Sequence, residues 1–188
     1  AVFVQEMLAE RGLTLADCDA VCVSMGPGSY TGLRVGVSTA KGLCFGSGKP
    51  LLAVGTLDTL VAQAADEAGA EGGADAARRA DVAGRADVAG RADVAGGADV
   101  AGGAGQYRYI IPMIDARRME VYTAVFEPTG ASATANGSED TLSYRQITET
   151  APVIIDENSF AKELEEGPVL FIGDGAGKCA DVLKHPNA

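Results

Sequence analysis

Histidine is nearly missing from this sequence: among 188 residues the single histidine, His185, stands beside Pro186. A transition-metal centre built on imidazole needs several histidines, and a Ser-His-Asp or Cys-His arrangement needs one histidine beside its nucleophile. Because His185 lies in a short polar stretch next to a proline, we expect a surface residue and not a catalyst. We therefore predict no metal site and no hydrolase triad.

Long apolar runs and paired cysteines are missing as well. No run of about 18 apolar residues is present that could span a bilayer, and no signal-peptide pattern is visible. The four cysteines, Cys18, Cys22, Cys44 and Cys179, form no CxxC pair, and most lie in apolar segments. This usage predicts reduced, mostly buried thiols in a cytoplasmic protein without a membrane anchor.

Positive charge is scarce. The chain has 15 Lys and Arg against 26 Asp and Glu, which gives a formal net charge of −11. An acidic chain repels phosphate backbones, so a large nucleic-acid footprint of its own is not expected. If the protein acts on nucleic acid, a partner should hold most of it.

The most informative stretch that is present runs from Met25 to Phe45. Residues 20–25 form a short apolar run that predicts a buried strand, and a segment with helical spacing follows the glycine turn. Backbone N–H groups converge at the start of such a helix, where Ser29 or Thr31 could supply a side-chain cap. The spacing G-x-G-x-x-x-G fits no common nucleotide fingerprint. A phosphate-facing loop and a tight turn that needs positive φ therefore both remain open for Gly26, Pro27, Gly28, Ser29, Tyr30, Thr31 and Gly32.

The helix after this turn has two distinct faces. Leu33, Val37, Ala40 and Cys44 share one face at 100° per residue, which predicts packing on a sheet. Each internal glycine costs about 1 kcal/mol relative to alanine, so Gly36 and Gly42 suggest close approach of a second helix. Residues 1–11 form another apolar helix that Gly12 should end. We predict a partner surface on these two helices, comprising Phe3, Met7, Arg34, Gly36, Lys41 and Phe45.

Residues 64–105 differ in composition from the rest of the chain. They contain 16 alanines, 10 glycines and no aromatic residue, and Ala-Asp-Val-Ala-Gly repeats four times between Ala80 and Gly103. Val82–Asp87 superficially fits the hexapeptide pattern of β-helix acyltransferases. The whole repeat region from Ala80 to Gly103, however, has 24 residues, which make little more than one coil of such a helix. A stacked core needs more coils, so we predict a flexible, duplicated insertion.

The segment after the insertion predicts a hairpin. Residues 109–115 and 120–126 read as paired strands, and Ala116–Met119 form the turn between them. The charged residues around this turn are Asp115, Arg117, Arg118 and Glu120. Two interpretations remain: a polar site facing a cleft between lobes, formed by Asp115, Arg117 and Glu120, or a solvated turn.

The remaining elements are a loop at 128–140, a short acidic helix at 159–166 and a strand followed by a glycine loop at 169–178. This last loop is not a P-loop, because one residue is missing before Gly177-Lys178 and Cys179 stands in the Ser or Thr position.

Two motifs resemble a known family. Gly26–Leu43 with Gly48–Leu60, and the shorter Ile114–Tyr122, are similar to bacterial TsaB (YeaZ) proteins, and the resemblance covers roughly residues 1–63 and 106–180. It implies an α/β fold with the two-lobed, actin-like (ribonuclease-H-like) ATPase architecture. The predicted organisation is a partial N-terminal lobe at 1–63, a low-complexity insertion at 64–105 and a partial second lobe at 106–188. The glycine loop at 173–178 is then the counterpart of an adenosine-side loop.

The resemblance also implies a function. TsaB proteins are partners of TsaD in making N6-threonylcarbamoyladenosine beside the anticodon of tRNAs that read codons starting with A. TsaD carries a metal site with histidines after the strand that corresponds to 51–54, whereas Val54–Leu60 holds no histidine. The expected role is thus a non-catalytic subunit that pairs with a TsaD homologue or with itself, meets a TsaE homologue through the complex, and reaches tRNA only through it.

Two further expectations follow from the resemblance. It implies no resident cofactor, with ATP or ADP bound only weakly or together with the partner; a kinase-like ATPase acting on a small molecule is the alternative. The sequence starts inside a predicted helix, and the family has an N-terminal strand hairpin before this helix and a C-terminal region beyond Ala188. We therefore expect a fragment with an incomplete form of the fold.

Overall fold

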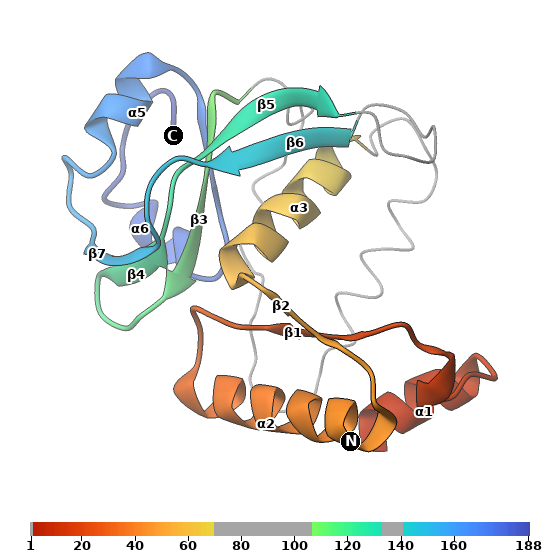
Figure 1. The fold of residues 1–188 in the computed structure, drawn as a ribbon. Coiled ribbons are helices and arrows are strands. Elements are labelled where there is room, and N and C mark those ends of the chain that lie inside the picture. The colour runs from red at the N-terminus through yellow and green to blue at the C-terminus, as the bar shows by residue number, and fades with distance from the viewer. Residues whose placement is uncertain (1, 70–106, 133–140) are drawn as a thin grey trace. The chain divides into compact units, whose positions relative to one another are not determined.

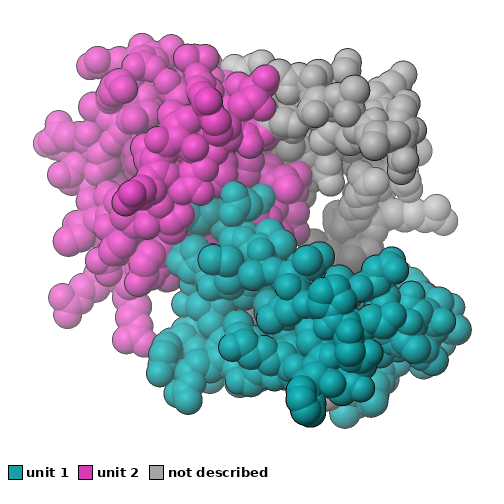
Figure 2. All heavy atoms as spheres, viewed as in Figure 1, with its two compact units in different colours: residues 1–58 teal, residues 59–188 magenta. Residues whose placement is uncertain are grey.

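A computed structural model describes residues 2–69, 107–132 and 141–188 of the chain, which fall into two compact units, residues 1–58 and 59–188 (Figure 2). Most of the alanine- and glycine-rich insertion predicted at 64–105 lies outside the described residues. The two units are described separately below.

Unit 1 consists of a short parallel sheet, a long helix along one side of it and a shorter N-terminal helix (Figure 1). Helix α1 (Val2–Glu10) ends at Gly12, which has φ of 66°, and Leu13 N donates to Leu8 O at 2.9 Å. This Schellman-type ending is the one predicted for the first helix. A single 3-10 turn, η1 (Leu15–Asp17), follows, and Thr14 and Asp17 form a capping box at its start.

The parallel pair in unit 1 is β1 (Val21–Ser24) with β2 (Leu51–Val54), in a register that places Val23 opposite Ala53. Helix α2 (Tyr30–Ser47) connects them and packs mainly on β1. It ends at Gly48, whose φ of 69° is the left-handed conformation that glycine adopts without strain. The predicted packing face is confirmed, because Ala40 is buried and Leu33, Val37 and Cys44 are partly buried.

Unit 2 is a curved sheet with helices against it. Helix α3 (Thr56–Gly69) begins in unit 1 and leads into it. The central strand β3 (Tyr109–Asp115) pairs with β4 (Glu120–Thr123), β5 (Phe126–Ser132) and β8 (Val169–Ile172). Strands β6 (Thr141–Gln146) and β7 (Ala151–Ile154) complete the sheet, in the order β6-β5-β3-β4-β7 with β8 on β3. The helices after β7 and β8 are α5 (Ala161–Glu166) and α6 (Ala176–Cys179).

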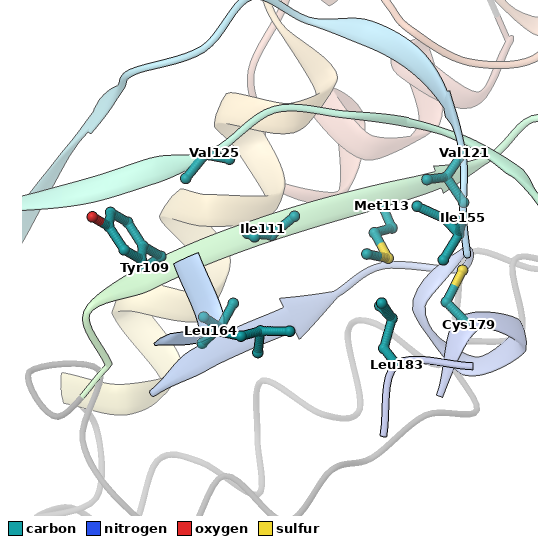
Figure 3. Close-up of a cluster of buried hydrophobic side chains, with 10 residues drawn as sticks. Tyr109, Ile111, Met113, Val121, Val125, Ile155, Leu164, Cys179 and Leu183 are labelled. Carbon is teal, nitrogen blue, oxygen red and sulfur yellow. The ribbon is translucent and has the colours of Figure 1, made fainter. Parts of the chain in front are cut away.

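The hydrophobic core belongs to unit 2. Six of the seven residues of β3 are buried, so both faces of this strand are covered. Figure 3 shows Tyr109, Ile111 and Met113 following one another along β3, with Leu164, Cys179 and Leu183 packed against this face. In unit 1, by contrast, the buried hydrophobic residues of the described chain are only Ala40 and Leu57. The core therefore fixes the end of β3, where the charged hairpin begins.

The structure corrects three predicted elements. The predicted hairpin is confirmed where β4 pairs with β3, but its second strand, predicted at 120–126, is interrupted at Ala124 and Val125, and β5 begins at Phe126. The loop predicted at 128–140 is wrong at its start, where β5 continues to Ser132 across a bulge between Pro128 and Gly130. A bulge accommodates a proline that lacks the N–H needed for regular pairing. The predicted helix 159–166 begins later, at Ala161.

Candidate functional site

The glycine turn of unit 1 is held by backbone hydrogen bonds to the end of β2. Met25 N donates to Val54 O and Thr56 N donates to Gly26 O, each at 2.9 Å. Gly26 has φ of 109°, and a Cβ at this position would lie 3.2 Å from Leu33 Cδ1. The need for positive φ and a close neighbour explains this glycine in structural terms.

The start of α2 is capped as predicted. The Ser29 side chain accepts a hydrogen bond from Gly32 N at 3.4 Å, and Leu33 N donates to Ser29 O at 2.8 Å. Gly28, Ser29, Tyr30 and Thr31 are exposed beyond this cap. The phosphate-facing role of residues 26–32 stays a prediction, and the cap satisfies one of the N–H groups that an anion would otherwise use.

The outer face of α2 is apolar, cationic and open. Phe45 is 94% exposed and Tyr30 is 74% exposed, which is unusual for aromatic residues on a monomer surface. Arg34 and Lys41 are exposed on the same helix, which contains no acidic residue. An open groove of about 450 Å³ runs along part of this face, lined by Tyr30, Thr31, Arg34, Val35, Ser38 and Thr39.

Two side chains that line this groove, Tyr30 and Arg34, contact each other. Arg34 Nη1 donates to Tyr30 Oη at 3.3 Å, and the Arg34 guanidinium carbon lies 5.3 Å from the centre of the Tyr30 ring. This contact covers one face of the Tyr30 ring and holds the cation at the surface.

The predicted partner residues occupy different environments. Phe3 and Met7 on α1 are 61% and 42% exposed, and Lys41 and Phe45 are exposed on α2. Gly36 lies next to β1, because a Cβ there would be 3.9 Å from Val23 Cγ2, and its place on the partner surface stays a prediction. The backbone approach predicted at Gly42 is not supplied by the described residues, because a Cβ there would meet nothing within 4 Å.

The second candidate region lies in unit 2, where β3 and β8 run parallel and end side by side. Their register pairs Pro112 with Ile172, so Asp115 and the loop that starts at Gly173 meet at one sheet edge. Gly175 N donates to Met113 O at 2.9 Å, and Asp115 N donates to Asp174 Oδ1 at 3.0 Å. The carboxyl edge of parallel strands is where ligands commonly bind in α/β folds.

The Lys178 side chain lies at this edge of the sheet and contacts both strands of the hairpin. Its Nζ donates to Asp115 Oδ1 and, at 2.7 Å, to Glu120 O, while Arg117 N donates to Asp115 Oδ1 at 2.8 Å. The hydrogen bond from Lys178, followed by that from Arg117 N, lowers the pKa of Asp115. Burial raises the pKa of the adjacent Cys179 thiol, which therefore stays protonated and unreactive.

Asp115 thus lies close to backbone atoms of Arg117 and Glu120. Lys178, which the sequence analysis did not predict as a site residue, contacts both Asp115 and Glu120. Lys178 was considered only as part of an imperfect P-loop. A signal was available, because parallel pairing of 109–115 with 169–172 would place Lys178 near Asp115. That Asp115, Arg117 and Glu120 face a cleft between lobes stays a prediction.

The part of the chain that the structure describes contains no cluster of three or more His, Cys, Asp or Glu side chains with a geometry for holding a metal ion. Its helices include none that is both long and apolar enough to cross a bilayer.

The N-terminal segment of the chain is similar to two related groups of proteins, TsaB proteins and threonylcarbamoyltransferases of the TsaD type. A family model described as TsaD, tRNA N6-adenosine threonylcarbamoyltransferase, matches residues 1–72. A tRNA threonylcarbamoyladenosine biosynthesis protein TsaB from Haemophilus influenzae is 47% identical over 64 residues, which are 34% of this chain and 27% of that protein. TsaB from Escherichia coli is 42% identical over 57 residues, 30% of this chain and 25% of that protein. These matches confirm the resemblance to TsaB (YeaZ) proteins over the first third of the chain.

A catalytic relative matches nearly as well. The tRNA N6-adenosine threonylcarbamoyltransferase of Maricaulis maris is 47% identical over 55 residues, 29% of this chain and 15% of that protein. The similarity of this segment therefore does not separate the two groups. The matched part of the chain spans about a quarter of the length of the two TsaB proteins.

Two solved structures are similar over more of the chain. YeaZ from Pseudomonas aeruginosa aligns with a TM-score of 0.49 and 23% identity, covering 80% of this chain and 49% of that one. An uncharacterized protein with similarity to peptidase YeaZ, also from Pseudomonas aeruginosa, aligns with a TM-score of 0.45 and 22% identity. This alignment covers 93% of this chain and 70% of that one.

Proposed function

We propose that this chain acts as a non-catalytic partner subunit in the formation of N6-threonylcarbamoyladenosine on tRNA, working with a threonylcarbamoyltransferase of the TsaD type. The observation that carries the proposal is the 47% and 42% identity of its N-terminal segment to two tRNA threonylcarbamoyladenosine biosynthesis proteins TsaB. The kinase-like alternative finds no support among the similar proteins.

The choice of the non-catalytic role rests on side-chain chemistry. The segment Val54–Leu60, which follows β2, supplies one acidic side chain, Asp58, and no histidine. A single carboxylate cannot assemble a transition-metal centre, and the chain's only histidine is the exposed His185. In this proposal the subunit provides a binding surface for the transferase, and the transferase carries the catalytic residues.

The partner surface that fits this role is the outer face of α2 together with α1. Ten of the twelve exposed large hydrophobic side chains in the described residues lie in unit 1, although this unit is the smaller one. Aromatic and arginine side chains are enriched in protein interfaces, and Tyr30, Arg34 and Phe45 are of these types. Gly42 leaves room for the backbone of a second helix. A second copy of the chain would compete for the same face.

Nucleotide, tRNA and a TsaE homologue belong to the assembled complex in this proposal. ATP or ADP would bind weakly or only with the partner, and the tRNA would be held mainly by the transferase, because a net charge of −11 opposes a large footprint. The complex would act in the cytoplasm.

The test is reconstitution of the full-length protein with its threonylcarbamoyltransferase homologue. We expect co-purification of the two, and modified tRNA from tRNA, threonine, bicarbonate and ATP only when the transferase is present. Threonylcarbamoyladenosine formed by this subunit alone would overturn the non-catalytic role. Robust release of phosphate from ATP by the protein alone would favour the kinase-like alternative instead.

A further inference from the structure

The tip of the β3–β4 hairpin carries two arginines in an unusual backbone conformation. Arg117 has φ of 78° and Arg118 has φ of 48°, so two consecutive side-chain-bearing residues adopt the left-handed region. Glycine and asparagine are the residues that usually occupy such turn positions. Left-handed φ strains a residue such as arginine, because its Cβ crowds the neighbouring backbone, and asparagine and glycine largely avoid this strain.

The turn is held rigidly from below. Glu120 N donates to Arg117 O at 3.1 Å and Ala116 N donates to Glu120 O at 3.1 Å, which closes the turn. Lys178 and Asp115 tie its base to the loop after β8. The same ion pair neutralises Asp115, whose carboxylate accepts a hydrogen bond from Arg117 N in the turn.

The two guanidinium groups differ from four of the five other cations that the structure describes in unit 2, and Lys184, which is exposed and unpaired, is the fifth. Arg108 and Arg145 pair with Glu127, Lys162 pairs with Glu166, and Lys178 pairs with Asp115. Arg117 and Arg118 are both exposed, and among the described residues neither has an ion-pair or hydrogen-bond partner for its side chain. The strained tip therefore presents two free guanidinium groups to the outside.

We propose that the Arg117–Arg118 turn is a contact for the phosphate backbone of the tRNA in the assembled complex. Guanidinium groups bind phosphate with two parallel hydrogen bonds, and a rigid turn loses little entropy on binding. A protein partner is less well matched, because interfaces need an apolar centre. In the described chain β3, β4 and the neighbouring β7 carry one exposed large hydrophobic residue, Ile154 on β7. This inference rests on the proposed function, and it adds a small footprint to a subunit whose overall charge is unfavourable.

The backbone conformation provides a sharp test. In the double substitution Arg117→Asn with Arg118→Gly, both new residues tolerate positive φ, so the guanidinium groups are lost while the turn is relieved of strain. We expect the thermal midpoint of the full-length protein to stay equal or rise by about 2–4 °C. Binding of tRNA to the complex with the transferase should weaken about 10- to 100-fold near 0.1 M salt, and the slope of log K against log salt should fall by about 1–2.

The matched control is Lys184→Ala, which removes an exposed cation elsewhere in unit 2 and should change neither quantity. Unchanged tRNA affinity and salt slope in an intact complex would overturn the inference. Loss of complex assembly with unchanged tRNA binding by the transferase would overturn it too, because the turn would then be a protein contact. Failure of the unaltered protein to assemble with the transferase would instead remove the proposed function, and the placement of the turn on tRNA with it.

Discussion

At the scale of single residues, the end of the second unit's sheet depends on one lysine. Lys178 reaches from α6 to Asp115 and to the carbonyl of Glu120, and its side chain is only 23% exposed. Two segments that are far apart in the sequence, the β3–β4 hairpin and α6, meet at this ammonium group. Removal of its charge should therefore lower the free energy of unfolding, whatever its effect on activity.

Lys178→Met retains most of the length of the side chain and removes the charge. Hydrogen bonds to charged groups contribute about 1.5–3 kcal/mol, and the 48% exposure of Asp115 reduces this, so we expect a loss of about 1 kcal/mol at pH 7. Urea unfolding measures it, with Lys184→Met as the control. A loss no larger than that of the control would contradict the role given to Lys178.

The same pair gives a pH dependence. The pKa of Asp115 is lower in the folded state than its ordinary value of about 3.9, so its contribution is complete above that value. As the pH falls through the lowered pKa, the contribution is lost. The stability difference between the natural protein and Lys178→Met should thus shrink between pH 5 and about pH 2. A constant difference over this range would show that Asp115 does not respond to Lys178.

Gly173, in the loop after β8, and Gly177, in the following helix α6, form a matched pair. Gly173 has φ of 99°, and a Cβ there would overlap Met113 O, whereas a Cβ at Gly177 would meet nothing within 4 Å. We expect Gly173→Ala to destabilise the protein by about 2–4 kcal/mol, from strain and from the displaced β3 carbonyl. Gly177→Ala should be neutral or slightly stabilising. Thermal melts of the two variants compare them directly, and equal midpoints would contradict this account.

At the scale of elements, α2 is the best example of what the sequence reveals and what it does not. Its start, its Ser29 cap and its packing face follow from local patterns, and the structure confirms them. The contact of Gly36 with β1 did not follow from the sequence, because a helical wheel gives angles but not the width of the sheet that the helix covers. The pairing of β3 with β8 joins distant segments, so local patterns could not reveal the Lys178–Asp115 contact.

The exposed face of α2 permits a clean test of the partner surface. Lys41→Glu and Phe45→Glu change exposed residues, so the free energy of unfolding should change by less than about 0.5 kcal/mol. Affinity for the transferase should fall by tenfold or more if this face is buried there, as calorimetry would report. Lys162→Glu on α5 is the same charge reversal at a position 80% exposed in unit 2, and it should leave affinity unchanged. Equal affinities for all three variants would exclude this face.

At the scale of the whole molecule, apolar side chains are distributed unequally. Unit 2 contains nearly all of the buried hydrophobic residues, while unit 1 contains most of the exposed ones. Composition could not predict this division, because the overall apolar content of 47% averages over both units and the insertion. A unit with so little buried apolar surface has little to offset its conformational entropy.

We therefore predict different local stabilities along one chain. Amide hydrogens of β1 and β2 should exchange with solvent at least tenfold faster than those of β3, because local opening is easier where little apolar surface is buried. Addition of the transferase should slow exchange in α2 and β1 and leave β3 nearly unchanged. Hydrogen exchange followed by mass spectrometry measures both, and uniform protection of the two units would contradict the prediction.

The two-strand sheet of unit 1 has a further consequence for the behaviour of the protein in solution. Within the described residues, β1 and β2 pair only with each other, so each offers one row of unpaired backbone N–H and C=O groups. Leu52 and Val54 on β2 are also exposed, at 52% and 38%. Open strand edges next to apolar side chains are templates for self-association and aggregation. During synthesis and storage, unit 1 would be the part that needs a chaperone or an early-bound partner to keep the protein monodisperse.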